Sequence, residues 1–172
     1  MTLLLGEEFG ALFDAYEHTA FRLEVRDSYL GVAYEQDPFH KWLSGEPDDK
    51  EWRRTWLDGV RARAARGKVM SRVRVVTLPP TDYARFSYHN CADNIAAGED
   101  IRYLARADAG GLPDYDFWLF DSSRLFVMHF SNMDEFLGAE PVDDPKIIVQ
   151  HAAWRDGAWH RATPYQDFKI SP

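Results

Sequence analysis

A strand-helix-strand unit between residues 72 and 102 constrains the fold of this chain more than any other part of the sequence. Residues 72–76, Arg-Val-Arg-Val-Val, alternate in character, so a strand there places two guanidinium groups on one face and two valines on the other. Thr81 then predicts the N-cap of a helix, and Gly98 predicts its end in a left-handed turn. Residues 101–104, Ile-Arg-Tyr-Leu, predict a second strand.

One domain built around this unit is what the length and composition allow. The chain has 172 residues, of which 45% are hydrophobic and 15% aromatic, enough to bury a single core. We therefore predict one α/β domain over residues 1–172, with a central mixed sheet covered by helices.

Further apolar patterns predict the other elements of this domain. Helical spacing of apolar residues predicts helices near residues 9–16, 39–43, 52–64 and 143–161, the last with Gly157 as a potential break. Arg53 and several later arginines are expected on the exposed side of the third helix. Alternation predicts a half-buried or edge strand at 21–25. Two apolar runs, 116–120 and 124–130, predict a hairpin at the centre of the sheet.

The charge balance disfavours two classes of partner. The 28 acidic and 20 basic residues give a net charge of -8, which opposes a nonspecific grip on nucleic acid or on an anionic membrane. Residues 3–5, Leu-Leu-Leu, are neither preceded by a positive charge nor part of a long apolar run, so no signal peptide or membrane span is predicted. We expect a cytoplasmic protein with no direct nucleic-acid contact.

Metal and nucleophile patterns give no catalytic prediction. Cys91 is the single cysteine and is expected to be a small buried residue, and the six histidines show no metal-ligand spacing. Ser122 and Ser123 lack the glycine-flanked turn of a serine hydrolase nucleophile. No cofactor and no metal site are predicted.

A group of arginines and carboxylates forms the candidate site. Arg72 and Arg74 share one face of their strand, and Arg102 belongs to a strand expected to be its parallel neighbour. Guanidinium groups match planar oxyanions bidentately, which favours a phosphate or carboxylate ligand. The start of the following helix adds backbone amides that favour an anion. The predicted ligand-binding residues are Arg72, Arg74, Tyr83, Arg85, Glu99, Asp100, Arg102, Asp116 and Trp118.

Two interpretations of this group stay open. In the first, the arginines hold an anionic ligand, the carboxylates orient the arginines, and Tyr83 or Trp118 provides an apolar wall. In the second, the charges form a structural network that holds strand ends and helix termini together, because buried charges must be paired.

Several of these segments together resemble a known family. Residues 20–24, 72–76, 82–86, 97–102 and 116–121, in that order, resemble the actinobacterial domain of unknown function family DUF6879. The resemblance extends from about Phe9 to Tyr165 and includes Trp52, Trp56 and the closing Ala158-Trp159 segment. It implies a small stand-alone cytoplasmic domain encoded beside helix-turn-helix regulators and small companion proteins, and it implies no activity.

The order of elements also resembles, in topology, the phospholipase D-like domain that serves as a sensor in some regulators. Enzymes of that superfamily place a lysine two residues after a histidine. Here Cys91 follows His89 at that position and Ala162 follows His160, so phosphodiester hydrolysis by that route is not expected.

The sequence therefore favours a non-enzymatic regulatory or interaction module. It would sense a small anionic ligand and act with a helix-turn-helix regulator or a small companion protein. One alternative is a hydrolase or transferase acting on a phosphorylated small molecule, with His89 or Asp116 as the nearest base. The other is a toxin-like or antitoxin-like partner of a DNA-binding regulator.

Overall fold

A seven-stranded mixed sheet forms the centre of the computed structural model, which describes residues 2–170 apart from the side chain of residue 33. The strands are β1 (Thr19–Glu24), β2 (Val69–Val76), β3 (Glu99–Ala105), β4 (Phe117–Phe120), β5 (Arg124–Phe130), β6 (Phe136–Val142) and β7 (Thr163–Pro164). They lie in the order β6-β5-β4-β1-β2-β3-β7. β1, β2 and β3 are parallel, whereas β4, β5 and β6 extend the sheet from β1 as an antiparallel meander.

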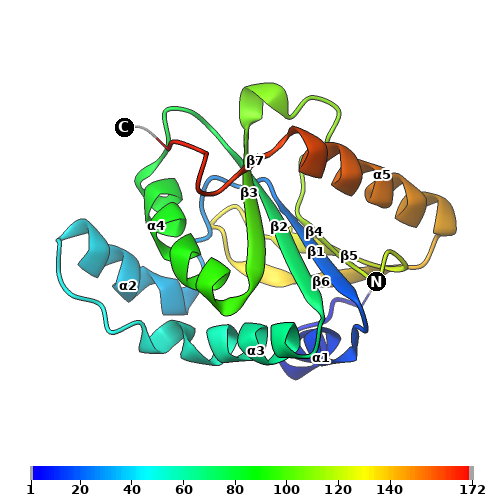
Figure 1. Ribbon diagram of the computed structural model, residues 1–172, viewed down its shortest axis with the longest axis horizontal. Helices are drawn as coiled ribbons and strands as arrows, with labels where there is room; N and C mark the ends of the chain where they lie inside the picture. Colours follow the sequence, from blue (N-terminus) through cyan, green and yellow to red (C-terminus); the bar gives the residue numbers. More distant parts are fainter. Residues whose placement is uncertain (1, 171–172) are drawn as a thin grey trace.

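Helices cover both faces of this sheet (Figure 1). They are α1 (Gly6–Ala15), α2 (Ala33–Leu43), α3 (Arg54–Ala65), α4 (Asp82–Ala97) and α5 (Pro145–Arg161), with the short 3-10 turns η1 (Glu51–Arg53) and η2 (Arg106–Asp108). α1 and α3 pack on one face in a cluster with Trp118 and Phe120, and α5 packs on the other face through Ala158 and Ala162. The predicted α/β fold with a central mixed sheet covered by helices is confirmed.

The alternation in β2 separates an apolar face from a polar one. Val73 and Val75 are almost fully buried in the cluster beneath α5. Arg72 and Arg74 therefore face the opposite side, toward α3 and α4, as the pleat requires. The predicted strand, with both guanidinium groups on one face and the valines on the other, is therefore observed.

Thr81 and Gly98 bound α4 as predicted, and Asp144 caps α5. The Thr81 hydroxyl accepts a hydrogen bond from the Ala84 amide at 3.1 Å, and Gly98 ends α4 with a φ of 112°. The Asp144 carboxylate caps α5 by accepting from the Lys146 amide at 2.8 Å. α5 continues through Gly157, because the neighbouring Ala158 is buried against the sheet and that packing holds the helix.

The position of β1 differs from the prediction of a half-buried or edge strand. β1 is the middle strand of the sheet, between β4 and β2, and its residues from Ala20 to Glu24 are all buried. The polar positions of its alternation, Arg22 and Glu24, face a second buried layer and not solvent. The predicted hairpin of β4 and β5 exists, but it lies to one side of β1 and is not the centre of the sheet.

Strand β6 is the longest element that the sequence patterns missed. It contains Gly138 and Pro141, two residues that weaken a strand prediction. β6 tolerates them because it is an edge strand, where a residue without an amide proton loses no ladder bond on the open side. A side chain at Gly138 would collide with Leu3, whose Cβ lies 2.6 Å from the position of an added Cβ.

Asp121 ties the β4–β5 hairpin to the start of β1. Its carboxylate accepts hydrogen bonds from the backbone amides of Glu17, His18 and Thr19 at 2.8 to 2.9 Å. Asp121 itself has a φ of 51°, a conformation that aspartate and asparagine tolerate better than most residues. The same side chain therefore shapes the turn and joins it to a distant segment.

We predict that Asp121→Asn lowers the free energy of unfolding by about 1–2 kcal/mol. Asparagine keeps the left-handed conformation but has a single acceptor oxygen, so at least one of the backbone amides loses its partner. Urea unfolding would measure the loss, with Asp114→Asn, at an exposed position, as the control. Equal stability of the two variants would show that the carboxylate is not an anchor.

Candidate ligand-binding site

The sheet register brings polar side chains of β1 and β2 together on one face. In the parallel pair, Arg22 lies opposite Arg72 and Glu24 lies opposite Arg74. In the antiparallel pair on the other side of β1, Arg22 lies opposite Trp118. Residues directly opposite in a ladder point to the same face, so these side chains form one layer at the middle of the sheet.

Glu24 is the centre of this layer. Its carboxylate accepts a hydrogen bond from Nη1 of Arg72 at 2.5 Å. It also forms ion pairs with Nε of Arg74 at 3.0 Å and with Nε of Arg22 at 3.4 Å. Burial by itself would raise the pKa of Glu24. The charges of Arg72, Arg74 and Arg22 instead lower this pKa from 4.5 to about 2.

Two further carboxylates hold the ends of the layer. Asp116, directly before β4, accepts hydrogen bonds from Nη2 of Arg22 at 2.9 Å and from the Tyr29 hydroxyl at 2.7 Å. Burial raises the pKa of Asp116, and the charge of Arg22 opposes that shift. On the other side, Glu99 accepts from Nε of Arg72 at 2.7 Å. Both carboxylates orient guanidinium groups.

Arg53 is buried, so the expectation of an exposed position for it is wrong. It donates from Nη1 to the Asn90 carbonyl at 2.8 Å and to the Asp93 carboxylate at 2.9 Å, and from Nη2 to the Asn94 side chain. A usable signal was present, because Arg53, Leu57 and Val60 fall at i, i+4 and i+7 and are all buried.

A pocket of about 670 Å³ lies above this polar layer. Its floor is the sheet, and its walls are mainly aromatic side chains from α1, η1, α3, α4 and the β5–β6 hairpin, with Glu35, Arg53 and Arg63 also lining it. Gly10, Tyr34 and Thr55 are exposed and lie at its rim. The polar floor residues are Arg22, Glu24, Arg72 and Arg74, with Ser87, Asn90 and Asn94 beside them, and the aromatic wall residues are Phe9, Phe13, Trp52, Trp56, Phe86, Phe130 and Phe136.

Free polar atoms on the pocket floor are mainly hydrogen-bond donors. Nη1 of Arg22 and Nη2 of both Arg72 and Arg74 donate no hydrogen bond to the described residues. Trp118 Nε1 and Asn90 Nδ2 are buried and likewise have no acceptor within the part of the chain that is described. A buried donor without an acceptor costs about 1–3 kcal/mol, so the donors of Trp118 and Asn90 favour a ligand that brings acceptors. The unused guanidinium nitrogens can donate to the same ligand.

Six of the nine predicted site residues lie at or beside this pocket. Arg72, Arg74, Tyr83 and Trp118 line it, whereas Glu99 and Asp116 hold the arginines from the sides. Arg22 and Glu24 are not among the predicted site residues, although residues 21–25 alternate as residues 72–76 do. That shared alternation was the signal available for them.

Arg102 and Asp100 are not part of the layer, and the expectation that Arg102 joins Arg72 and Arg74 is wrong. β3 is the parallel neighbour of β2, as predicted, but Arg102 lies opposite Val73 in the register and so faces α5. Its guanidinium stacks on Trp159, 3.9 Å from the ring centroid, and donates to the Trp159 carbonyl at 3.2 Å. Asp100 is two residues away on the same face and is exposed.

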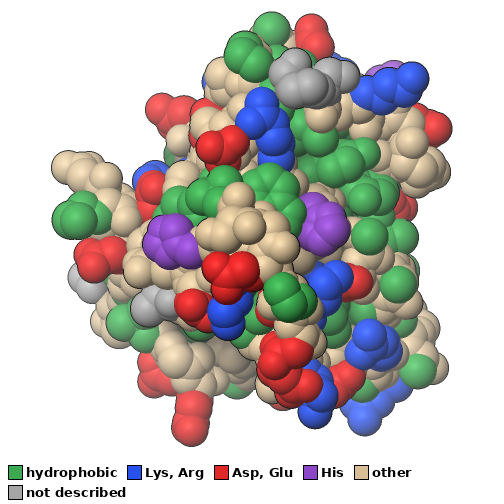
Figure 2. All heavy atoms as spheres, turned by 90° about the vertical axis from the view of Figure 1, so that its left-hand side faces the viewer, with side chains coloured by type: hydrophobic (Ala, Val, Ile, Leu, Met, Phe, Trp, Pro, Cys, Tyr) green, Lys and Arg blue, Asp and Glu red, His purple; other side chains and the backbone are tan. Residues whose placement is uncertain are grey.

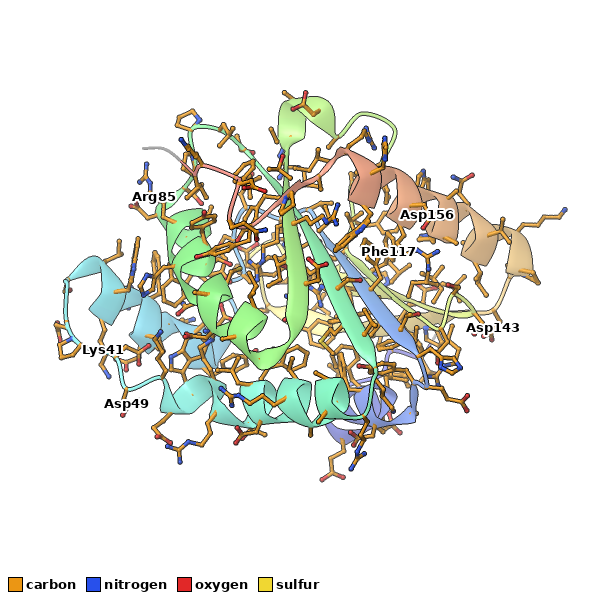
Figure 3. All side chains as sticks on the ribbon, viewed as in Figure 1. Lys41, Asp49, Arg85, Phe117, Asp143 and Asp156 are labelled. Carbon is orange, nitrogen blue, oxygen red and sulfur yellow. The ribbon has the colours of Figure 1, made fainter. Side chains whose placement is uncertain are left out.

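Arg85 also lies away from the pocket. It projects outward from the start of α4 (Figure 3) and pairs with Asp82 at 2.8 Å, one helical turn away. The expected anion site at this helix start is occupied by the chain itself, because the Thr81 hydroxyl caps the Ala84 amide. The acidic Asp82 in the first turn further disfavours an anion there.

The face that carries α2 and α4 shows acidic and basic side chains interspersed over its surface (Figure 2).

The described residues contain no cluster of His, Cys, Asp or Glu side chains that could hold a metal ion. Within the same residues, no helix is both long and apolar enough to cross a membrane. His129 pairs with Glu140 at 2.8 Å, and His89 is exposed.

Fold and site together define an α/β domain with a pocket above a buried ionic layer. The family described as Domain of unknown function (DUF6879) matches residues 7–170 of this chain. Because the match spans nearly the whole chain, the protein belongs to this family. A comparison with curated proteins finds no match.

We predict that Glu24→Gln lowers the free energy of unfolding by about 3–5 kcal/mol, because the guanidinium groups lose the charge that they share. Chemical unfolding at about pH 7 would measure this loss. Glu46→Gln, at an exposed position, is the matched control and is expected to stay within about 0.5 kcal/mol of the wild type. A loss of the same small size in both variants would contradict the central role of Glu24.

A comparison of the wild type with Glu24→Gln at several pH values gives a further prediction. Because the pKa of Glu24 is lowered in the folded state, its charge stabilises the fold above the unfolded pKa of 4.5, and this contribution is lost as the pH falls toward about 2. The stability difference between wild type and Glu24→Gln should therefore shrink steadily below about pH 5. A difference that stays constant between about pH 5 and about pH 3 would show that the Glu24 pKa is not lowered.

Proposed function

We propose that this domain is a non-enzymatic module that binds a small anionic ligand in the pocket above β1 and β2. Ligand binding would then alter its interaction with a regulatory partner. The observation that carries this proposal is the set of guanidinium nitrogens on the pocket floor that have no acceptor among the described residues. A purely structural network would use these donors internally. Here they lie beneath a pocket whose volume of about 670 Å³ falls in the range of small-molecule sites.

The arginines are already held in place for a ligand. Glu99 fixes the Nε edge of Arg72, and Glu24 accepts from one of its terminal nitrogens. Asp116 fixes one terminal nitrogen of Arg22. A ligand that binds the remaining nitrogens does not have to order these long side chains, so more of its interaction energy appears as affinity.

The geometry gives less support to a hydrolase or transferase acting on a phosphorylated small molecule. His89, one candidate base, is exposed on α4 and does not line the pocket. Asp116, the other, is 1% exposed and already accepts hydrogen bonds from Arg22, Tyr29 and the backbone. Both groups are poorly placed to remove a proton from a molecule in the pocket.

The proposed partner is a DNA-binding helix-turn-helix regulator or a small companion protein in the cytoplasm. The mixed charges on the face that carries α2 and α4 favour contact with a protein over direct contact with nucleic acid (Figure 2). Co-purification from the natural host would identify such a partner. A toxin-like role predicts arrested growth when the domain is expressed without that partner, whereas the regulatory role predicts normal growth.

We predict that Gly10→Phe abolishes ligand binding without destabilising the fold. Gly10 is a helical residue at the pocket rim, and a Cβ there meets nothing within 4 Å, so the backbone accepts a side chain, and we expect a phenylalanine ring to obstruct the entrance. Gly157→Phe is the matched control, because Gly157 is also helical with open space around it but belongs to α5 on the other face. Both variants should keep or slightly raise the melting temperature, since phenylalanine is a better helix former than glycine.

Native mass spectrometry of protein isolated from its own host provides the measurement. The wild type and Gly157→Phe should carry a bound small molecule, and Gly10→Phe should have the mass of the bare chain. Retention of the molecule by Gly10→Phe would place it outside the pocket. A bare wild type whose tryptophan fluorescence also responds to no organic anion would refute the proposed function.

A further inference from the structure

The charge balance of the polar layer limits the charge of the ligand. Arg22, Arg72 and Arg74 contribute three positive charges, and Glu24, Glu99 and Asp116 contribute three negative ones, so the formal sum is 3 − 3 = 0. A phosphate ester would add nearly two negative charges to this neutral and largely buried layer. A carboxylate adds one, and its cost of desolvation is correspondingly lower.

Two of the floor guanidinium groups lie over one indole ring. The guanidinium carbons of Arg22 and Arg72 lie 5.4 and 5.8 Å from the centroid of Trp118. Both guanidinium groups also reach the same oxygen, Oε1 of Glu24, at 3.4 and 2.5 Å, so they are adjacent. Trp118 Nε1 adds a neutral donor that has no acceptor among the described residues. Two adjacent guanidinium groups and an indole suit a planar group with two acceptor oxygens.

The aromatic walls above these donors fit a flat, apolar part of a ligand. Phe13 meets both Trp56 and Trp118 edge to face, with ring planes at 86° and centroids 5.3 and 4.9 Å apart. Trp52 and Phe86 form a second aromatic wall, with centroids 6.1 Å apart and planes nearly parallel. Aromatic surfaces favour aromatic partners through such contacts beyond the area that they bury.

We propose that the ligand is an aromatic monocarboxylic acid, whose carboxylate binds in the row formed by Trp118, Arg22 and Arg72 and whose ring lies between the aromatic walls. This inference rests on the proposed function, because it assumes that the pocket holds a ligand. Beyond the proposed function, it specifies the charge of the ligand, its flat aromatic shape and the residues that bind its carboxylate.

Calorimetric titration of the purified protein tests this ligand class with four probes. They are 2-naphthoate, its neutral amide 2-naphthamide, 2-naphthyl phosphate and the aliphatic acid hexanoate. We expect 2-naphthoate to bind about ten-fold or more tightly than each of the others, which corresponds to about 1.4 kcal/mol. Tighter binding of 2-naphthyl phosphate than of 2-naphthoate would contradict the proposal that the ligand carries a single negative charge. Equal binding of hexanoate would show that the ligand needs no aromatic ring. Equal binding of 2-naphthamide would show that it needs no carboxylate.

Trp118→Phe tests where the carboxylate lies. Phenylalanine keeps a flat ring in the floor and removes the Nε1 donor, so affinity for 2-naphthoate should fall about ten-fold or more while the fold persists. Trp154→Phe, on α5 at the other face of the sheet, is the matched control and should bind as the wild type does. Wild-type affinity in Trp118→Phe would overturn this placement, as would 2-naphthoate binding that Gly10→Phe leaves unchanged.

Failure of this inference can be distinguished from failure of the proposed function. If the host-derived protein carries a molecule that Gly10→Phe loses, and that molecule lacks an aromatic ring or a carboxyl group, the pocket binds a ligand and the ligand class is wrong. If neither a retained molecule nor any of the four probes binds, both fail. Binding of 2-naphthoate in wild type and Gly157→Phe, but not in Gly10→Phe, supports both.

Discussion

The charge of Glu24 is the interaction on which the polar side of this sheet depends. Arg22 and Arg72 lie directly opposite each other on neighbouring parallel strands, a pairing that places like charges side by side in a poorly screened interior. A single carboxylate on β1 reaches both of these guanidinium groups and that of Arg74 as well. The parallel pairing of β1 and β2 in this register is therefore tolerable because Glu24 lies within it.

This polar layer also explains why the helices leave a gap above the middle of the sheet. α1 and α3 contact the apolar side chains around Trp118 and Phe120, and α4 contacts those of β3. An apolar helix face laid across the arginines would bury their remaining donors without acceptors, at a cost of about 1–3 kcal/mol each. The pocket is the space that this constraint leaves open, and the aromatic residues along its walls belong to the same clusters that hold the surrounding helices.

The sequence predicted local structure well and relative placement poorly. Periodicity and capping residues located β2, α4 and both ends of α4, because those signals act within a few residues. The face of Arg102 depends on the register between β2 and β3, and a one-residue shift reverses it. The alternation at residues 21–25 was assigned to a half-buried or edge strand because the pattern alone does not distinguish solvent from a second buried polar layer. Arg22 and Glu24 were therefore not recognised as site residues.

Stability alone is a weak reason to keep such a layer in the middle of a sheet. Buried ion pairs can often be replaced by apolar side chains of similar volume at little or no cost in stability, because removing charges from water offsets much of their attraction. A layer kept only to hold strands together would also be expected to use its donors internally. Here Glu24, Glu99 and Asp116 fix the arginines but leave guanidinium nitrogens directed to a pocket. That combination of fixed side chains and unused donors is typical of a preorganised binding site, and it favours recognition over a purely structural role.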